Sequence, residues 1–231
     1  MVMASPDNKK ADLKIGFFVT GTDTDVGKTF FTASLAYSLS HAGHKVAPRK
    51  PIASGCILQT DGSLLSEDAL QLQSAAGNIE PLESICPNCF EPPISPHQAL
   101  LQAGKTITTR QLAHACQTPS GHIKLVEGAG GWYSPLSSDG LNADLAVELQ
   151  LPVILVAANR LGCINQILLS QEAVLNRGLK LAAIVINQIE PGTNYAADID
   201  DYVQAPLVSL PHQKSGQPLF LEQLAALVKE A

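Results

Sequence analysis

The sequence predicts an α/β fold, a mainly parallel β-sheet with helices on both faces. Apolar runs of strand length alternate along the chain with segments of helical periodicity. The runs are apolar at consecutive positions and rich in Val and Ile, which is typical of parallel strands buried on both faces. Three of them begin at residues 123, 152 and 181, a regular spacing that suits successive strand-plus-helix units.

The elements follow from these patterns in chain order. Residues 15–20 (IGFFVT) form the first apolar run, residues 29–41 form a helix that Gly43 ends, and residues 45–50 form the second strand. Residues 80–97 carry prolines at 81, 87, 92, 93 and 96 and are predicted to be a long loop. The remaining predicted strands are 123–127, 152–158, 181–187 and 206–210, and the remaining helices 67–76, 98–102, 108–117, 143–149, 165–177, 194–203 and 219–229.

Composition limits the class of protein. No stretch rich in Gly, Ser or Pro divides the chain, so we expect one domain over residues 1–231, with residues 1–14 flexible. A net charge of −6 argues against a dedicated nucleic-acid-binding protein. The longest apolar stretches are far shorter than the ~20 residues of a membrane helix, and the polar N-terminal residues lack the apolar segment of a secretory signal. Five cysteines, an odd number, suit reduced thiols in the cytoplasm, where we expect this protein.

The segment GTDTDVGKT, residues 21–29, predicts a phosphate-binding loop between the first strand and the first helix. Backbone N–H groups of such a loop and the positive end of the helix dipole surround an anion. Lys28 would reach the terminal phosphates, and the Thr29 hydroxyl would bind Mg²⁺. Five residues rather than the usual four separate the two glycines. The predicted fold is therefore P-loop NTPase-like.

Three more charged residues are candidates for the same site. Lys50 opens the segment KPIASG directly after the second strand, where it either points to solvent, as most lysines do, or faces the bound anion. Glu127 ends an apolar strand before a glycine-rich turn and is a candidate for holding Mg²⁺ or its water, with an ordinary strand-end turn as the alternative. Asp68 opens a predicted helix, where the helix dipole alone favours an acidic residue.

The placement of these residues strengthens the prediction. Lys28, Lys50, Glu127, Asn159 and Asn187 all lie at or just past the carboxyl end of a predicted strand. Open α/β sheets bind ligands along that edge. We therefore expect these side chains to share one site.

The segment Cys86-Pro87-Asn88-Cys89 is a weak signal for a metal. A tetrahedral zinc site needs four ligands and usually a second close pair. No such second pair follows in the sequence, so this segment implies no metal.

These motifs together resemble the dethiobiotin synthetase family. The matching segments keep one order over most of the chain: residues 21–29 (GTDTDVGKT), 50–55 (KPIASG), 67–73 (EDALQLQ), 92–97 (PPISPH), 126–132 (VEGAGGW), 151–166 (LPVILVAANRLGCINQ) and the strand ending at Asn187. The resemblance implies an ATP- and Mg²⁺-dependent cyclo-ligase that closes a ureido ring from 7,8-diaminononanoate and CO2. The reaction would pass through a carbamate and a carbamic–phosphoric anhydride, and it would release ADP and phosphate.

The resemblance also implies residue roles. Lys28 and Lys50 would be catalytic, and Thr29, Asp68 and Glu127 would hold Mg²⁺. The nucleotide is expected at Asp25, Val26, Gly27, Lys28, Thr29, Phe30, Asp68, Glu127, Gly128, Ala129, Gly130, Asn187, Gln188, Pro211, His212 and Gln213. The diamine is expected at Thr24, Ser54, Leu161, Gly162, Cys163 and Asn165, of which the last four would come from the neighbouring subunit of a homodimer.

Two features depart from the family pattern, and two other functions stay open. Gln188 stands where relatives often carry Asp, and the chain past Pro211 matches poorly, so the preference for a nucleotide base is not fixed. A partitioning-type ATPase switch usually has an extra lysine early in its phosphate loop, where Thr22 and Asp23 stand here. A cobyrinate-synthetase-like nucleotide domain would need a glutaminase domain, for which 231 residues leave no room.

Overall fold

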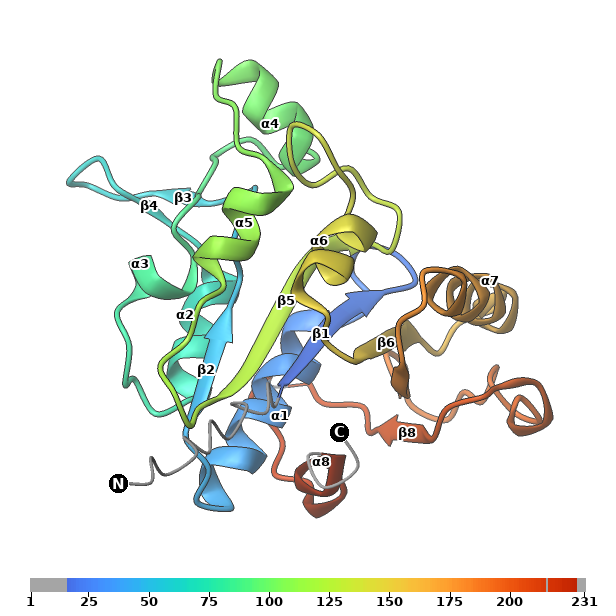
Figure 1. Cartoon of the computed structure of the whole chain (residues 1–231). Helices are drawn as coiled ribbons and strands as arrows, with labels where there is room; N and C mark the ends of the chain where they lie inside the picture. The colour runs from blue at the N-terminus through green and yellow to red at the C-terminus, as the bar shows by residue number, and fades with distance from the viewer. Residues whose placement is uncertain (1–15, 215, 228–231) are drawn as a thin grey trace, which may run out of the picture.

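A computed structural model describes residues 16–214 and 216–227 and contains a six-stranded sheet (Figure 1). All neighbouring strands of this sheet run parallel, as predicted. The strand order is β2-β5-β1-β6-β7-β8. The strands are β1 (Gly16–Gly21), β2 (Val46–Arg49), β5 (Ile123–Gly131), β6 (Val153–Ala158), β7 (Leu181–Asn187) and β8 (Leu207–Leu210).

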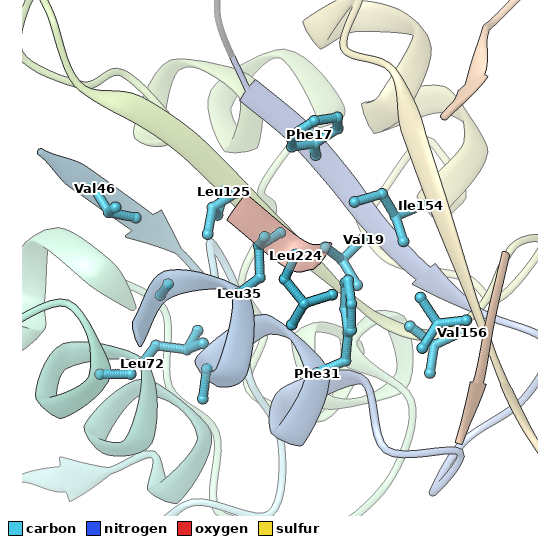
Figure 2. Close-up of a cluster of buried hydrophobic side chains, with 14 of the residues drawn as sticks. Phe17, Val19, Phe31, Leu35, Val46, Leu72, Leu125, Ile154, Val156 and Leu224 are labelled. Carbon is cyan, nitrogen blue, oxygen red and sulfur yellow. The ribbon is translucent and has the colours of Figure 1, made fainter. Parts of the chain in front are cut away.

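Helices cover both faces of the sheet, because successive residues of each strand point to opposite faces. Phe17 and Val19 of β1 face a core built with helices α1, α2 and α8, shown in Figure 2. Phe18 faces a second core built with α5, α6 and α7. The helices are α1 (Lys28–His41), α2 (Glu67–Ala75), α3 (Leu82–Ile85), α4 (Pro96–Gln102), α5 (Thr109–Ala115), α6 (Asn142–Leu149), α7 (Cys163–Asn176) and α8 (Glu222–Ala226).

The predicted helix over residues 194–203 is wrong. The segment consists of turns and one short 3-10 helix, η1 (Asp200–Tyr202). The backbone N–H groups of Tyr195 and Ala196 donate to Oδ1 of Asn159, at 2.9 and 3.1 Å, and Asp198 adopts a positive φ of 60°. The N–H groups of a first helical turn have no partner within the helix, so these two bonds are compatible with one. The left-handed backbone at Asp198 is what interrupts the predicted helix.

The predicted loop over residues 80–97 is wrong in part. It contains α3 and the start of α4, where Pro96 occupies the first turn and the Ser95 side chain caps the helix. Proline is tolerated there because its missing N–H has no partner within the helix. The sequence reading also missed a short antiparallel hairpin of β3 (Ile57–Leu58) and β4 (Leu64–Leu65).

The ends of the chain limit two other predictions. The flexible segment expected at residues 1–14 lies outside the described residues, and so do the last residues of the helix expected at 219–229. None of the helices in the described part of the chain is both long and apolar enough to span a bilayer.

Candidate active site

The phosphate-loop motif lies between β1 and α1, at the carboxyl edge of the sheet. Gly27 precedes α1 with a φ of 92°, a left-handed conformation that favours glycine. A side chain at position 27 would also collide with the Asn187 amide. Lys28 and Thr29 begin the helix, and its first turn contains no acidic residue. The loop therefore presents the free N–H groups and the positive end of the helix dipole to an anion.

The Lys28 side chain is held inside this loop. Its ammonium donates to the backbone carbonyl of Asp23 at 2.9 Å, and the residue is buried. Burial, with a smaller contribution from the nearby Lys50 charge, lowers the pKa of Lys28 to about 8. A phosphate group bound in the loop would provide a negative charge that pairs with the Lys28 ammonium.

Four side chains from separate parts of the chain meet beside the loop. The Lys50 ammonium lies 2.6 Å from Glu127 Oε1 and 2.8 Å from Asp68 Oδ2. The Thr29 hydroxyl lies 2.8 Å from both Asp68 Oδ1 and Glu127 Oε1 and can donate its one proton to either. Thr29 and Asp68 lie at the starts of α1 and α2, Lys50 follows β2, and Glu127 lies within β5, directly after its last pair with β2. Of the five residues that the strand-end placement predicts to share one site, Lys50 and Glu127 meet in this cluster. Asn159 instead bonds to Gln188 and to the loop after β7.

The electrostatics of the cluster favour its charged forms. Burial alone would lower the pKa of Lys50, but the charges and hydrogen bonds of Glu127 and Asp68 outweigh it and raise the pKa above its usual range. Burial is the largest single influence on Asp68 and alone would raise its pKa, but the Lys50 charge, the hydrogen bonds from Lys50 and Thr29 and the Lys28 charge together outweigh it and lower that pKa. Lys50 is only 4% exposed, which excludes the solvent-facing alternative. Asp68 does more than favour a helix dipole, since it pairs with Lys50.

A cavity of about 430 Å³ opens onto this cluster. Lys50 and Asp68 form part of its wall, and Ser54 follows Lys50 on the same loop. The other lining residues are Thr24, Asp25, Gly27, Lys28, Thr29, Phe30, Ala53, Ala129 and Gly130. Among residues 25–30 and 127–130, which are expected at the nucleotide, Val26, Glu127 and Gly128 do not line the cavity. The cavity thus gathers the predicted phosphate side and part of the predicted diamine side.

Five further residues expected at the nucleotide do not line this cavity: Asn187, Gln188, Pro211, His212 and Gln213. Asn187 is buried and donates from Nδ2 to the carbonyl of Val26 at 3.0 Å, which ties the end of β7 to the phosphate loop. The Gln188 side chain accepts a hydrogen bond from Asn159, and a ring nitrogen of His212 lies 3.2 Å from the Gln188 carbonyl. Pro211 and Gln213 are exposed.

The segment expected to bind the diamine from a second subunit begins α7. Gly162 precedes the helix with a φ of 90°, Leu161 is 84% exposed, and Asn165 is exposed, whereas Cys163 is buried. None of the four residues lines the 430 Å³ cavity of the same chain. An ion pair of 3.1 Å between Arg160 and Asp23 connects this segment to the phosphate loop.

Sequence reasoning missed Arg160 and the roles of two buried asparagines. Asn159 was placed at the ligand edge, but its bonds to Gln188, Thr193, Tyr195 and Ala196 depend on the folded loop. Asn142 bonds to the backbone after Glu127, and no local pattern marks it. Arg160 is the second residue after the end of β6, and a charged residue at that edge of the sheet could have indicated a contact with the ligand site.

The oxygen atoms of the cluster fit a magnesium ion. Thr29, Asp68 and Glu127 supply hard oxygen donors, and Glu127 Oε2 is buried without a hydrogen-bond partner. Within residues 16–214 and 216–227, no three His, Cys, Asp or Glu side chains cluster as a metal site. Mg²⁺ suits a site of this kind, because it is usually bound by one or two carboxylates together with phosphate oxygens and water.

The two cysteines at positions 86 and 89 are free thiols. Their Sγ atoms lie 3.6 Å apart, which is a contact between thiols rather than a disulfide bond.

Comparisons with known proteins agree with this geometry. A family model described as an AAA domain matches residues 16–215. Over 177 residues, 75% of each chain, the sequence is 46% identical to the ATP-dependent dethiobiotin synthetase BioD of Marinobacter nauticus. It is 35% identical over 218 residues to the protein of the same name from Rhodopirellula baltica, covering 87% of this chain and 85% of the relative.

Solved structures support the fold alone. The cell division ATPase MinD of Pyrococcus furiosus is 15% identical with a TM-score of 0.56, and the match covers 93% of this chain and 97% of MinD. MinD of Pyrococcus horikoshii, complexed with Mg-ADP, is 16% identical with a TM-score of 0.56, over 94% of this chain and 95% of its own. The predicted P-loop NTPase-like fold is confirmed.

Proposed function

The chain belongs to the dethiobiotin synthetase family, and from this premise we propose that its site closes the ureido ring of dethiobiotin from 7,8-diaminononanoate and CO2. Relatives that carry this name match most of the chain. The observation that carries the proposal is the group of Lys50, Glu127, Asp68 and Thr29 beside the phosphate loop. Together with Lys28 of the loop, it places two lysine ammonium groups, two carboxylates and a hydroxyl next to one cavity.

The proposed reaction has three bond-forming steps. One amine of the substrate attacks CO2 and loses a proton, which gives a carbamate. A carbamate oxygen then attacks the γ-phosphorus of ATP, the bond to ADP breaks, and a carbamic–phosphoric anhydride results. The second amine attacks the carbamate carbon and loses a proton to solvent or to the departing phosphate, the carbon–oxygen bond to phosphate breaks, and the ring closes as phosphate leaves.

Lys28 and Lys50 are the proposed catalytic cations. Negative charge on the phosphoryl oxygens must be stabilised during transfer, and positioned cations are the main source of such catalysis. Lys28 would exchange its bond to the Asp23 carbonyl for a phosphate oxygen. Lys50 stays charged because of its two carboxylate partners, and it lines the cavity where the transferred group would lie.

Thr29, Asp68 and Glu127 would hold Mg²⁺. Bound there, the ion would neutralise phosphate charge and help to orient the γ-phosphoryl group. In this structure the Lys50 ammonium forms ion pairs with the carboxylates of Asp68 and Glu127. We expect this ammonium to move toward the phosphate oxygens when the two carboxylates bind a metal ion.

The diamine site is proposed to be shared between two copies of the chain. Thr24 and Ser54 line the cavity, so they are the contacts that one copy offers. Ile164 and Asn165 lie in the first turn of α7, where N–H groups have no partner within the helix and suit the carboxylate of the diamine. Since residues 161–165 do not line the cavity of their own chain, a second copy would have to supply them, in a homodimer in the cytoplasm.

The nucleotide base is proposed to lie near Asn187, Gln188 and residues 211–213. The bond between Asn187 and the Val26 carbonyl supports this, because it places the end of β7 against the phosphate loop.

The test is release of ADP when substrates are supplied in combination. We expect ADP release that requires the diamine, bicarbonate and Mg²⁺ together, with one dethiobiotin formed per ADP. ADP release that is independent of the diamine would favour an ATPase switch instead. The Lys50→Gln variant serves as a control for contaminating ATPases.

A further inference from the structure

The backbone directly after Glu127 leaves the regular sheet. Val19 of β1 pairs with Glu127 of β5, and the next pair joins Gly21 to Gly131. Three residues of β5 therefore lie opposite a single residue of β1, which makes a β-bulge. Bulges are frequent next to active sites, and they leave backbone groups without ladder partners. On the other side of β5, the pairing with β2 ends at Val126.

The side chain of Asn142 takes the place of the missing strand neighbour. Its Oδ1 accepts from the N–H of Ala129 at 3.0 Å, and its Nδ2 donates to the Ala129 carbonyl at 2.6 Å. The same Nδ2 lies 3.0 Å from the Gly131 carbonyl and 3.3 Å from that of Ser134. Asn142 is fully buried, so water cannot supply these bonds if the side chain is lost.

Asn142 contacts the wall of the 430 Å³ cavity from behind but does not line the cavity itself. Ala129 and Gly130, at the centre of the bulge, form one wall of the 430 Å³ cavity, together with Lys50 and Ser54. Asn142 is not among the lining residues and lies behind this wall, at the start of α6, which contacts β5 (Figure 1). A side chain on Gly128 would collide with Asn142 Oδ1, so glycine at position 128 permits the close approach.

Ala129 and Gly130, which the family resemblance assigns to the nucleotide, line the same cavity as Ser54, a proposed contact of the diamine. We propose that Asn142 is a positioning residue that fixes the wall formed by Ala129 and Gly130 for the diamine. This rests on the proposed function. The amide of asparagine supplies an acceptor and two N–H donors to this backbone. Ionised aspartate supplies no donor, serine supplies only one donor on a shorter side chain, and an apolar residue supplies neither group.

Bonds that do not involve Asn142 also hold the phosphate loop, since the Thr22 N–H donates to the Val156 carbonyl of β6 and Asn187 of β7 donates to the Val26 carbonyl. We therefore expect loss of Asn142 to misplace the cavity wall and to leave phosphate binding in place. A small misplacement at a reacting centre lowers the rate strongly.

Kinetics of Asn142→Ser and Asn142→Asp test the proposal. We expect kcat/KM for the diamine to fall at least ~30-fold, since geometric errors of this kind cost up to ~100-fold. The Kd for Mg-ADP, measured by calorimetry, should stay within about twofold of the wild type. The matched control is Gln171→Ala. Gln171 is also a buried amide that binds a loop backbone, at Tyr202 and Gln204, and it does not line the cavity.

Gln171→Ala should lower Tm by a similar amount without changing kcat/KM. The proposal is overturned if kcat/KM falls equally in Asn142→Ser and Gln171→Ala, or if it is unchanged in Asn142→Ser.

Hydrogen exchange at the backbone amides of the wild type is a second test, which requires neither a folded variant nor turnover. The Ala129 amide, which has no strand partner, should exchange at least ~1,000-fold more slowly than an unprotected amide. Free exchange at Ala129 would overturn the proposal, whereas absence of dethiobiotin from the wild type would overturn only the proposed function.

Discussion

Replacing Lys28 with methionine should stabilise the protein at neutral pH while abolishing turnover. Methionine keeps the length of the lysine side chain but removes its charge. The pKa of Lys28 falls from 10.5 to about 8 on folding, and burial is the main cause. This shift of 2.5 units corresponds to a cost of about 3 kcal/mol for burying the charged form, at about 1.4 kcal/mol per unit. Loss of the hydrogen bond to the Asp23 carbonyl costs about 1 kcal/mol.

The net gain in the free energy of unfolding should therefore be about 2 kcal/mol at pH 7. Below pH 8 the lysine is charged in both the folded and the unfolded chain, so folding carries the full cost. As the pH rises from about 8 to 10.5, the folded protein releases this proton before the unfolded chain does, and the cost disappears. Above pH 10.5 only the lost hydrogen bond remains, and the variant should be the less stable protein.

Urea unfolding of wild type and variant from pH 7 to 11 measures this difference directly. Lys45→Met, a change at an exposed lysine, controls for the loss of one surface charge. A stability difference between wild type and Lys28→Met that is constant over this range would refute the reasoning, because it would show that the Lys28 ammonium is not buried at a cost. Lost turnover alone would not decide the matter.

Three further changes test other parts of the site. Lys50→Gln should lower kcat/KM by more than ~100-fold but change ATP affinity by less than about fivefold, because a cation that faces the transferred group acts in the transition state. Equal losses of kcat/KM and ATP affinity would show that Lys50 only binds ATP. Glu127→Gln should raise the Mg²⁺ concentration for half-maximal activity at least ~10-fold, because a metal ligand is lost. The control Glu148→Gln, at an exposed glutamate, should leave this concentration unchanged. If the Mg²⁺ dependence of Glu127→Gln matched that of the wild type, Glu127 would not be a metal ligand. Mixing Asn165→Ala with Lys28→Ala should restore activity after subunit exchange, because each heterodimer keeps one intact site; activity equal to the sum of the parents would contradict a shared site.

Much of the fold could be predicted because both faces of the sheet are buried. Strands such as 152–158 are apolar at nearly every position, and this pattern depends little on the details of neighbouring loops. The contact between Lys50 and Glu127 followed from one rule, since each comes directly after the last paired residues of the adjacent parallel strands β2 and β5. Asp68 was undervalued because an acid at a helix start is common for electrostatic reasons alone.

The remaining features depend on contacts between distant residues. Residues 194–203 have a helical pattern, but the left-handed backbone at Asp198 interrupts it, and Asn159 binds this loop from the end of another strand. The bulge after Glu127 is stabilised by Asn142 from the start of α6, and neither residue type nor spacing indicates that pairing. Local sequence therefore indicates which residues end each strand, while buried amides determine how the loops beyond those ends are held.

Transfer of oxygen from CO2 tests the central claim most directly. The reaction is run briefly with ATP, the diamine and CO2 labelled with both ¹³C and ¹⁸O, before exchange with water removes the ¹⁸O. Because a carbamate oxygen attacks the γ-phosphorus and later leaves with it, we expect one ¹⁸O in each phosphate and the ¹³C in the ureido carbonyl of the product. Unlabelled phosphate formed alongside labelled dethiobiotin would contradict the anhydride route, and phosphate formed without labelled dethiobiotin would contradict ring closure at this site.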